Sequence, residues 1–320
     1  MLGRYGFGGC IAGLIMLLFS SVSAASGVLE EVAEFGSNPG QLRLFQYRPA
    51  SLRTPAPLVV ALHGCQQTAV DYAKQAGWVE QADRWGFMLL LPEQRRTNNL
   101  QRCFNWFQLT NRDQGESGSI QQMIVRTQQH VAIDSQRIYV AGLSAGGAMA
   151  AVLLVNYPDL FAGGAIIAGI PYGCASGIVS GLRCQLSGRD LEPSAWGDLV
   201  RQALAGAVPK KWPIVSIWQG TADWVVDATN ARELVEQWTA VHGLELGVAT
   251  TETGQGYSHQ VYRDTAGQPR VESYLITGMG HGQAIDPGPG ANQCGIQADY
   301  AVVVGMCASY QILRFWGLGL

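Results

Sequence analysis

The chain has 320 residues, of which 48% are hydrophobic and 14% are charged. This composition is typical of a globular protein with a substantial core and excludes a disordered chain. The net charge is -3, from 21 Lys and Arg against 24 Asp and Glu, and the sequence has no basic run. We therefore expect no nucleic-acid partner.

The first residues have the three parts of a secretory signal peptide. Arg4 supplies a positive charge, residues 11–19 are apolar, and residues 22–24 form a small-residue exit. We expect a signal peptide over residues 1–24 and a secreted protein, either periplasmic or extracellular. The alternative is a membrane anchor, but the apolar stretch is short and interrupted by Gly13. We therefore expect no stable membrane anchor after cleavage.

Cleavage would remove Cys10 and leave an even number of cysteines. An even number in an exported chain indicates disulfides, although six cysteines allow many connectivities. The short separations suggest two local pairs and leave a third by remainder: Cys174 with Cys184, Cys294 with Cys307, and Cys65 with Cys103. No pair has the spacing of a zinc site, so we expect no metal, and nothing indicates another cofactor.

The first elements after the signal are an opening hairpin and two buried strands. Residues 29–35 and 41–47 are two expected edge strands with a turn-rich connector between them. Residues 57–62 form a continuous apolar run, typical of a strand that is covered on both faces. A helix over 69–85 and a buried strand over 86–91 follow.

Helices and buried strands then continue to alternate along the chain. The remaining predicted segments are a long loop over 95–118, a helix over 119–130, a strand over 137–143 with a helix after it, a strand over 164–167, a loop over 169–188, a helix over 192–204, a strand over 213–218, a helix over 230–241, strands over 257–262 and 271–276, and a final helix over 300–315. This alternation predicts an α/β fold with a mostly parallel central sheet flanked by helices. With no repeat and no linker, we expect residues 25–320 to form a single domain.

The strongest motif is the Gly-x-Ser-x-Gly sequence of residues 142–146. An apolar, β-branched run leads into it, and small helix-forming residues follow at once. Strand, sharp turn and helix are the context of a nucleophile elbow, in which the serine, here Ser144, is held in a strained conformation with an exposed hydroxyl. The five-residue pattern alone is weak in a chain with 40 glycines, and the alternative is a Gly-rich loop. The flanking segments favour the elbow.

A serine hydroxyl needs a general base, and the base needs a carboxylate that fixes its tautomer. His281 is favoured as the base because it lies in a glycine-lined loop directly after a late strand. The other histidines have different settings: His63 in the loop before the first helix, His130 within a helix, His242 at a helix end, and His259 within a strand.

Asp223 is the favoured carboxylate. It follows the strand over 213–218 and stands between Ser144 and His281 in the chain. The order Ser, Asp, His is that of α/β-hydrolases. Asp227 is the leading competitor, although aspartates in turns are commonly helix caps.

Acyl transfer also needs preorganised donors for the negative charge that develops on the carbonyl oxygen. The backbone N–H of Ala145 is one expected donor. The other should come from the turn His63-Gly64-Cys65, with the Cys65 N–H favoured. A disulfide between Cys65 and Cys103 would make this turn rigid.

The same disulfide would bring the loop around Trp106 close to Ser144. Trp106 and Trp224 are therefore candidates for the pocket that binds the acyl or alcohol part of a substrate. The alternative for each is an ordinary buried aromatic side chain in the core.

The chain resembles the catalytic domain of extracellular polyhydroxybutyrate depolymerases and their esterase relatives, in the group with the oxyanion motif before the lipase box. The motifs that carry the resemblance are Leu62-His63-Gly64-Cys65, Cys103-Phe104-Asn105-Trp106-Phe107, Gly142 to Met149, Gly220-Thr221-Ala222-Asp223, Gly278-Met279-Gly280-His281 and Arg314 to Leu318. The resemblance covers about residues 57–318. It implies an α/β-hydrolase fold with Ser144, Asp223 and His281 as a triad and with His63 and Cys65 in the oxyanion region.

The implied function is that of a secreted serine esterase that hydrolyses short-chain poly(3-hydroxyalkanoate) or 3-hydroxybutyrate esters through an acyl-serine intermediate. The expected partner is thus a polyester or oligomeric ester substrate. The alternatives are a feruloyl or acetylxylan esterase, and a non-catalytic polymer-binding protein with a hydrolase fold. Depolymerases that attack solid granules resemble this domain followed by a linker and a substrate-binding domain, and we expect no separate substrate-binding domain here.

Overall fold

The computed structural model describes residues 1–3, 5–6, 27–108, 112–204 and 209–319. The signal peptide expected over residues 1–24 falls mostly outside these ranges and stays a prediction. Among the helices in these ranges, none combines the length and the apolar character needed to cross a membrane.

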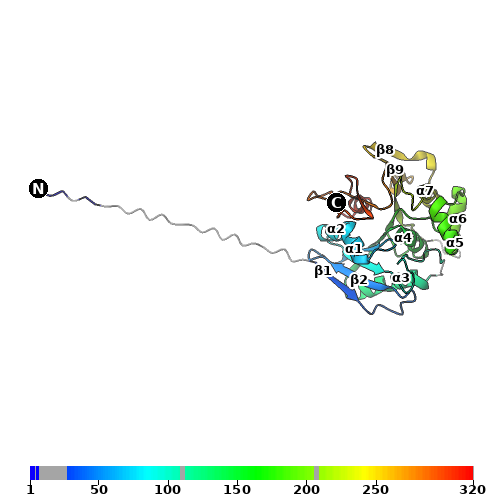
Figure 1. Ribbon diagram of the computed structural model, residues 1–320, viewed down its shortest axis with the longest axis horizontal. Helices are drawn as coiled ribbons and strands as arrows, with labels where there is room; N and C mark the ends of the chain where they lie inside the picture. The colour runs from blue at the N-terminus through cyan, green and yellow to red at the C-terminus, as the bar shows by residue number, and fades with distance from the viewer. Residues whose placement is uncertain (4, 7–26, 109–111, 205–208, 320) are drawn as a thin grey trace.

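A ten-stranded sheet runs through the centre of the molecule (Figure 1). Its strands, in spatial order, are β1 (Val28–Val32), β2 (Arg43–Arg48), β4 (Met88–Glu93), β3 (Ala56–Leu62), β5 (Ile133–Leu143), β6 (Gly163–Ile167), β7 (Ile214–Gly220), β10 (Pro269–Ile276), β9 (Tyr257–Arg263) and β8 (Thr250–Gly254). The strands from β4 to β10 in this order pair in parallel, and the antiparallel strands lie at the two edges. The predicted parallel α/β fold and the opening hairpin of β1 and β2 are confirmed.

Helices cover both faces of this sheet. The helices are α1 (Ala69–Gln75), α2 (Trp78–Trp85), α3 (Gly115–His130), α4 (Ala145–Asn156), α5 (Ile178–Ser187), α6 (Pro193–Ala203), α7 (Thr229–His242) and α8 (Ala308–Phe315). Alternate residues of the central strands face opposite sides: Leu58 and Val60 contribute to the core with α3, α4, α6 and α7, whereas Val59 contributes to the core with α1, α2 and α8. The buried, fully apolar strand predicted over 57–62 is thus covered on both faces.

The helix predicted over residues 69–85 is two helices, because Gly77 has a left-handed backbone (φ 77°) between α1 and α2. A Cβ on Gly77 would lie 2.6 Å from Cys294 Sγ, so this break also leaves room for the Cys294 disulfide. The loop that contains Cys294 is distant in sequence, so the helical pattern of residues 69–85 alone cannot show this break.

Two further predictions differ from the structure. The loop predicted over 169–188 contains α5, and the final helix begins at Ala308 rather than at residue 300. Residues 301–303 instead form β12 (Ala301–Val303), which pairs in parallel with β11 (Gln283–Ile285) in a small second sheet. Cys307 caps α8, since its sulfur accepts a hydrogen bond from the Tyr310 N–H at 3.3 Å.

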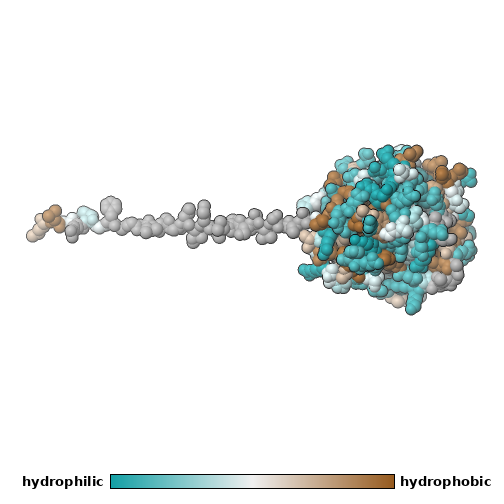
Figure 2. All heavy atoms as spheres, turned by 90° about the horizontal axis from the view of Figure 1, so that it is seen from below, coloured by the Kyte–Doolittle hydropathy of each residue, from teal (hydrophilic) through white to brown (hydrophobic). Residues whose placement is uncertain are grey.

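Three disulfides close loops around the fold. They join Cys65 to Cys103, Cys174 to Cys184, and Cys294 to Cys307. The pairing suggested by the spacing of the cysteines is confirmed. On the face of the domain shown in Figure 2, hydrophobic side chains are scattered among hydrophilic ones.

Candidate active site

Ser144 occupies the sharp turn between β5 and α4. Its backbone has φ 58° and ψ -122°, a conformation that costs free energy for any residue with a Cβ. The turn is also too tight for side chains on the flanking glycines: a Cβ on Gly142 would lie 2.1 Å from the Gly146 oxygen, and one on Gly146 would lie 2.3 Å from the Leu62 oxygen. The predicted arrangement of strand, strained turn and helix is confirmed.

His281 and Asp223 lie side by side beyond the carboxyl ends of β10 and β7. His281 Nδ1 is 2.8 Å from Asp223 Oδ2. The other carboxylate oxygen accepts hydrogen bonds from the N–H groups of Val225 and Val226, each at 2.9 Å, and Gln219 Nε2 donates to Oδ2 at 2.9 Å. Asp223 thus accepts four hydrogen bonds, and its geometry fixes the His281 ring with Nδ1 toward the carboxylate and Nε2 free to act elsewhere.

These contacts also determine the charge of Asp223. Burial acts to raise the pKa of its carboxyl group, but the hydrogen bonds from His281, Val226 and Val225 outweigh burial and hold the pKa below its usual value. The group is therefore a carboxylate at neutral pH. A carboxylate in this position keeps a proton on His281 Nδ1 and leaves Nε2 as the basic atom of the ring.

Ser144 and His281 line the same cavity, which has a volume of about 690 Å³. Within the described part of the chain, the Ser144 hydroxyl makes no hydrogen bond to the His281 ring. Such contacts are often loose in the absence of substrate and tighten when it binds. Two of the three residues predicted as a triad therefore line the cavity, and the third, Asp223, contacts His281 without lining it. One of the two expected side-chain hydrogen bonds is formed.

Two backbone N–H groups stand beside Ser144 on the cavity wall. Ala145 and Cys65 both line the cavity. Ala145 is the first residue of α4, so its N–H has no carbonyl partner within the helix and lies at the positive end of the helix dipole. The Cys65 N–H has no hydrogen-bond partner among the described residues. Both predicted donors therefore belong to residues of the wall that Ser144 shares, and their role in binding a carbonyl oxygen stays a prediction.

His63 lies behind this wall and does not line the cavity. Its ring is fully buried, and its Nδ1 is 2.7 Å from the Gly64 oxygen, while Nε2 accepts a hydrogen bond from the Gln94 N–H at 3.1 Å. Because a backbone N–H can only donate, Nε2 carries no proton and Nδ1–H donates to Gly64. The Gly64 carbonyl and the Cys65 N–H belong to one planar peptide group and point in opposite directions. His63 therefore orients the Cys65 N–H through this peptide.

A buried carboxyl group supports the loop that follows Cys103. Glu116 accepts hydrogen bonds from the Asn105 N–H at 2.8 Å, from Asn105 Nδ2 at 2.7 Å, and from Gln94 Nε2. Burial raises the pKa of Glu116. Gln94 thus contacts both Glu116 and His63, and one hydrogen-bond network holds the Trp106 loop and the Cys65 turn. Sequence reasoning missed Glu116, because it placed this residue in the loop over 95–118, whereas α3 begins at Gly115 and its first turn is buried against the Trp106 loop.

The two tryptophans predicted for the pocket have different positions. Trp106 lines the cavity and is nearly buried, with its ring 5.7 Å from that of Phe107 in an edge-to-face arrangement. Trp224 is 84% exposed and is absent from the cavity lining. The turn that places Val225 and Val226 on Asp223 and on the cavity wall directs Trp224 to solvent.

The competing residues have structural roles outside the cavity. Asp227 accepts a hydrogen bond from the Thr229 N–H at 2.8 Å and so caps the start of α7. His242 contacts the Pro213 oxygen at 3.0 Å, and His259 contacts Glu272 at 2.9 Å between β9 and β10. The pair of His259 and Glu272 resembles the pair of His281 and Asp223, but neither member lines the cavity.

Two histidines, the fully buried His63 and the half-buried His242, make the folded state sensitive to acid. Burial lowers the pKa of His63 and of His242 to about 4, from the ordinary value of about 6.5 for histidine. The unfolded chain takes up these protons first, so the stability that the neutral rings contribute is complete above about pH 6.5 and is lost as the pH falls toward 4. We expect each ring to contribute on the order of 3 kcal/mol of this pH dependence. Denaturant titration at several pH values measures it.

The pH dependence of the parent alone does not isolate the two histidines, because the buried carboxyl groups of Glu116 and Glu272 change the stability with pH in the opposite direction. Burial raises their pKa, so they favour the folded state as the pH falls. The test therefore compares variants. His63→Gln and His242→Gln should each flatten the decline between pH 6.5 and 4, whereas exposed His130→Gln should not. An unchanged pH dependence in both His63→Gln and His242→Gln would contradict the assignment.

The described residues contain no group of three or more His, Cys, Asp or Glu side chains arranged to hold a metal ion. The chemical groups that the cavity offers are a hydroxyl, an imidazole paired with a carboxylate, and two backbone donors. This set is sufficient for acyl transfer through a serine ester.

Comparison with known proteins places this chain in a family. A family model described as "Esterase PHB depolymerase" matches residues 43–258. The chain is 45% identical to poly(3-hydroxyalkanoate) depolymerase C of Paucimonas lemoignei over 306 residues, which are 95% of this chain and 73% of that protein. It is 32% identical to feruloyl esterase B of Talaromyces stipitatus over 84% of this chain and 75% of that protein.

The fold has a counterpart among solved structures. An acetyl xylan esterase from Aspergillus awamori superposes with a TM-score of 0.75 and 23% identity, over 92% of this chain and all of that chain. The fold is thus that of the α/β-hydrolases. The family match and the 45% identical relative show the chemistry of a carboxylic-ester hydrolase. On the family match and the 45% identical relative, the chain belongs to the esterase PHB depolymerase family.

Proposed function

We propose that Ser144, His281 and Asp223 are the nucleophile, the general base and the orienting carboxylate of this esterase. The observation that carries the proposal is the 2.8 Å contact between His281 Nδ1 and Asp223 Oδ2, at a cavity that Ser144 also lines from a strained elbow. We further propose that the substrates are short-chain poly(3-hydroxyalkanoate)s and oligomers of 3-hydroxybutyrate.

In the first half of the reaction, Ser144 Oγ attacks the ester carbonyl carbon and His281 Nε2 takes the hydroxyl proton. The carbonyl oxygen becomes an oxyanion that accepts hydrogen bonds from the N–H groups of Ala145 and Cys65. Each such donor is typically worth about 3 kcal/mol in the transition state. The intermediate then breaks its bond to the leaving oxygen, which takes the proton from His281 and departs as an alcohol. For a polyester, this alcohol is the hydroxyl end of a shortened chain.

In the second half, water replaces the alcohol. His281 Nε2 removes a proton from the water as its oxygen attacks the acyl carbon, and the same two N–H groups hold the second oxyanion. Ser144 Oγ then leaves with the proton from His281, and the carboxylic acid is released. Asp223 remains ionised throughout and stabilises the protonated imidazole in each half.

The cavity lining favours a neutral, largely aliphatic ester. No Lys, Arg, Asp or Glu side chain is present among the described residues that line it. Apolar walls come from Trp106, Ile170, Ile178 and Val226, and amides such as Asn105 offer hydrogen bonds to ester oxygens. The 45% identity to a poly(3-hydroxyalkanoate) depolymerase supports the same substrate class.

A feruloyl or acetylxylan ester is the second candidate. The aromatic pair of Trp106 and Phe107 on the cavity wall could stack against a feruloyl ring. The 32% identity to feruloyl esterase B supports this reading less strongly.

Initial rates on three substrates test these assignments: a soluble 3-hydroxybutyrate trimer, methyl ferulate and acetylated xylan. We expect kcat/KM for the trimer to exceed that for methyl ferulate by at least about tenfold, since one hydrophobic contact site can supply discrimination of this size. A higher value for methyl ferulate or xylan would overturn the substrate and leave the triad intact. Failure of an organophosphonate to label Ser144 would instead favour the third possibility, a polymer-binding protein with an inactive hydrolase fold.

We also infer a secreted protein whose residues 25–320 form a single catalytic domain. Three disulfides are typical of an oxidising compartment and support secretion. The continuous sheet that contains strands from β1 to β10 supports the single domain.

A further inference from the structure

Helix α5 presents an apolar stripe to solvent. The side chains of Ile178, Val179, Leu182 and Leu186 are 74%, 78%, 55% and 55% exposed. At about 100° per residue these positions fall within an arc of roughly 100° on the helix surface. A surface helix usually packs such a stripe against the core, whereas the apolar side of α5 faces solvent.

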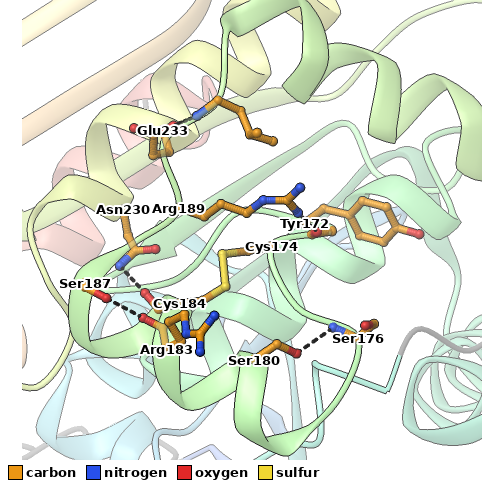
Figure 3. The surroundings of a disulfide bond; sticks show 12 residues. Tyr172, Cys174, Ser176, Ser180, Arg183, Cys184, Ser187, Arg189, Asn230 and Glu233 are labelled. Atoms are coloured by element: carbon orange, nitrogen blue, oxygen red, sulfur yellow. Dashed lines mark hydrogen bonds between the residues drawn. A yellow bond between two sulfur atoms is a disulfide. The ribbon is translucent and has the colours of Figure 1, made fainter.

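The opposite side of α5 is fixed to the protein. Gly181 and Cys184 are buried, and Cys184 forms the disulfide with Cys174 (Figure 3). Asn230 Nδ2 donates to the Cys184 oxygen at 3.0 Å, and the Asp227 N–H donates to the Gln185 oxygen at 2.9 Å. A covalent bond and two hydrogen bonds thus hold the apolar stripe outward.

The stripe is continuous with the cavity that contains Ser144. Ile178 and Leu182 line the cavity as well as being exposed, whereas Val179 and Leu186 lie only on the outer surface. Trp224 directly precedes Val225 and Val226 on the cavity wall and is 84% exposed. We name Ile178, Val179, Leu182, Leu186 and Trp224 the rim patch.

We propose that the rim patch binds the surface of a water-insoluble aliphatic polyester, and that a chain of this surface then enters the cavity. This inference rests on the proposed function. A soluble oligomer can enter the cavity without further contacts. A polyester chain in a solid can enter the cavity only if the protein surface around the cavity mouth binds the surface of the solid. The chemistry matches, because such a polyester is uncharged and α5 carries one charged side chain, Arg183. Grouped exposed apolar side chains typically mark a contact surface.

The test separates binding to the solid from hydrolysis. Val179→Ser with Leu186→Ser changes two rim residues that do not line the cavity. Val248→Ser is the matched control, because Val248 is 71% exposed and lies in the segment that follows α7. The end of α7 lies near the start of β7, since His242 contacts the Pro213 oxygen. Ser144 lies at the opposite, carboxyl end of the parallel strands. Each is made in the full chain, both with Ser144 intact and with Ser144→Ala to stop erosion of the solid.

The first measurement is depletion of the Ser144→Ala proteins from solution by poly(3-hydroxybutyrate) particles. We expect the double variant to bind at least about tenfold more weakly than its parent, and Val248→Ser to bind like the parent. In the Ser144 background, the double variant should hydrolyse the particles more slowly and the soluble trimer at the parental rate.

Equal binding by the double variant and its parent would overturn the proposal, as would a parent that does not bind the particles. Gel filtration tests whether a second copy of the chain covers the rim patch instead. A dimeric parent together with a monomeric double variant would assign the rim patch to a dimer interface. The proposed function fails separately, if the parent does not hydrolyse the trimer. Thermal unfolding at the parental temperature would show that the double variant is folded.

Discussion

Ser144→Ala is expected to lower kcat for a soluble 3-hydroxybutyrate ester by on the order of 10⁶-fold, because removing a nucleophile disables the whole catalytic unit. Alanine keeps the Cβ and therefore the same backbone conformation at φ 58°. The melting temperature should thus remain that of the parent. Initial rates over a range of substrate concentrations, together with a thermal scan, measure both quantities.

Ser135→Ala provides the matched control for this substitution. Ser135 lies on the same strand, β5, and is exposed. Its replacement should leave kcat and labelling by an organophosphonate unchanged, whereas Ser144→Ala should abolish labelling. Residual turnover within about a hundredfold of the parent, at an unchanged melting temperature, would refute Ser144 as the nucleophile.

Asp223→Asn is expected to lower kcat by about 10⁴-fold, the size of effect seen when an orienting carboxylate becomes an amide. One carboxylate oxygen accepts two backbone N–H groups, from Val225 and Val226, and the other accepts from Gln219 and His281. An asparagine would keep its oxygen on the two backbone donors and turn its NH₂ group toward His281. The ring would then carry its proton on Nε2 and could not act as the base.

Asp227→Asn is the control for this change, since Asp227 lies in the same turn and its carboxylate accepts from the Thr229 N–H at the start of α7 rather than contacting His281. Asparagine is also a good cap, so activity and stability should change little. The pH dependence of kcat for each variant, measured on the soluble trimer, distinguishes a changed tautomer from a general loss of folding. A loss of less than tenfold in Asp223→Asn would contradict the role of the carboxylate.

The sequence was sufficient for those parts of the site that depend on local rules. The run over 57–62 had to be buried on both faces, and Gly142 and Gly146 made a tight turn at Ser144 the favoured structure. Asp223 and His281 each follow a predicted buried strand, and the structure shows that these strands, β7 and β10, are parallel neighbours. Parallel strands deliver their carboxyl ends to one edge of the sheet, so these residues meet there.

The parts that escaped prediction depend on partners that are distant in sequence. The apolar residues of α5 share one side of the helix, but the sequence cannot show that this side faces solvent and that a disulfide holds the opposite side in place. The role of His63 depends on the Gln94 N–H, and the burial of Glu116 depends on Asn105 and Gln94. None of these pairings has a periodic or motif signal.

The burial of α4 has a consequence for how the protein responds to heat. All twelve residues of α4 are buried, so its amide protons can reach solvent only when the core opens as a whole. Helix α5 has an exposed face and is held by one disulfide and a few hydrogen bonds, so it belongs to the part of the structure that opens at lower cost. On warming, we therefore expect the part of the cavity wall that α5 forms to open before the turn that holds Ser144.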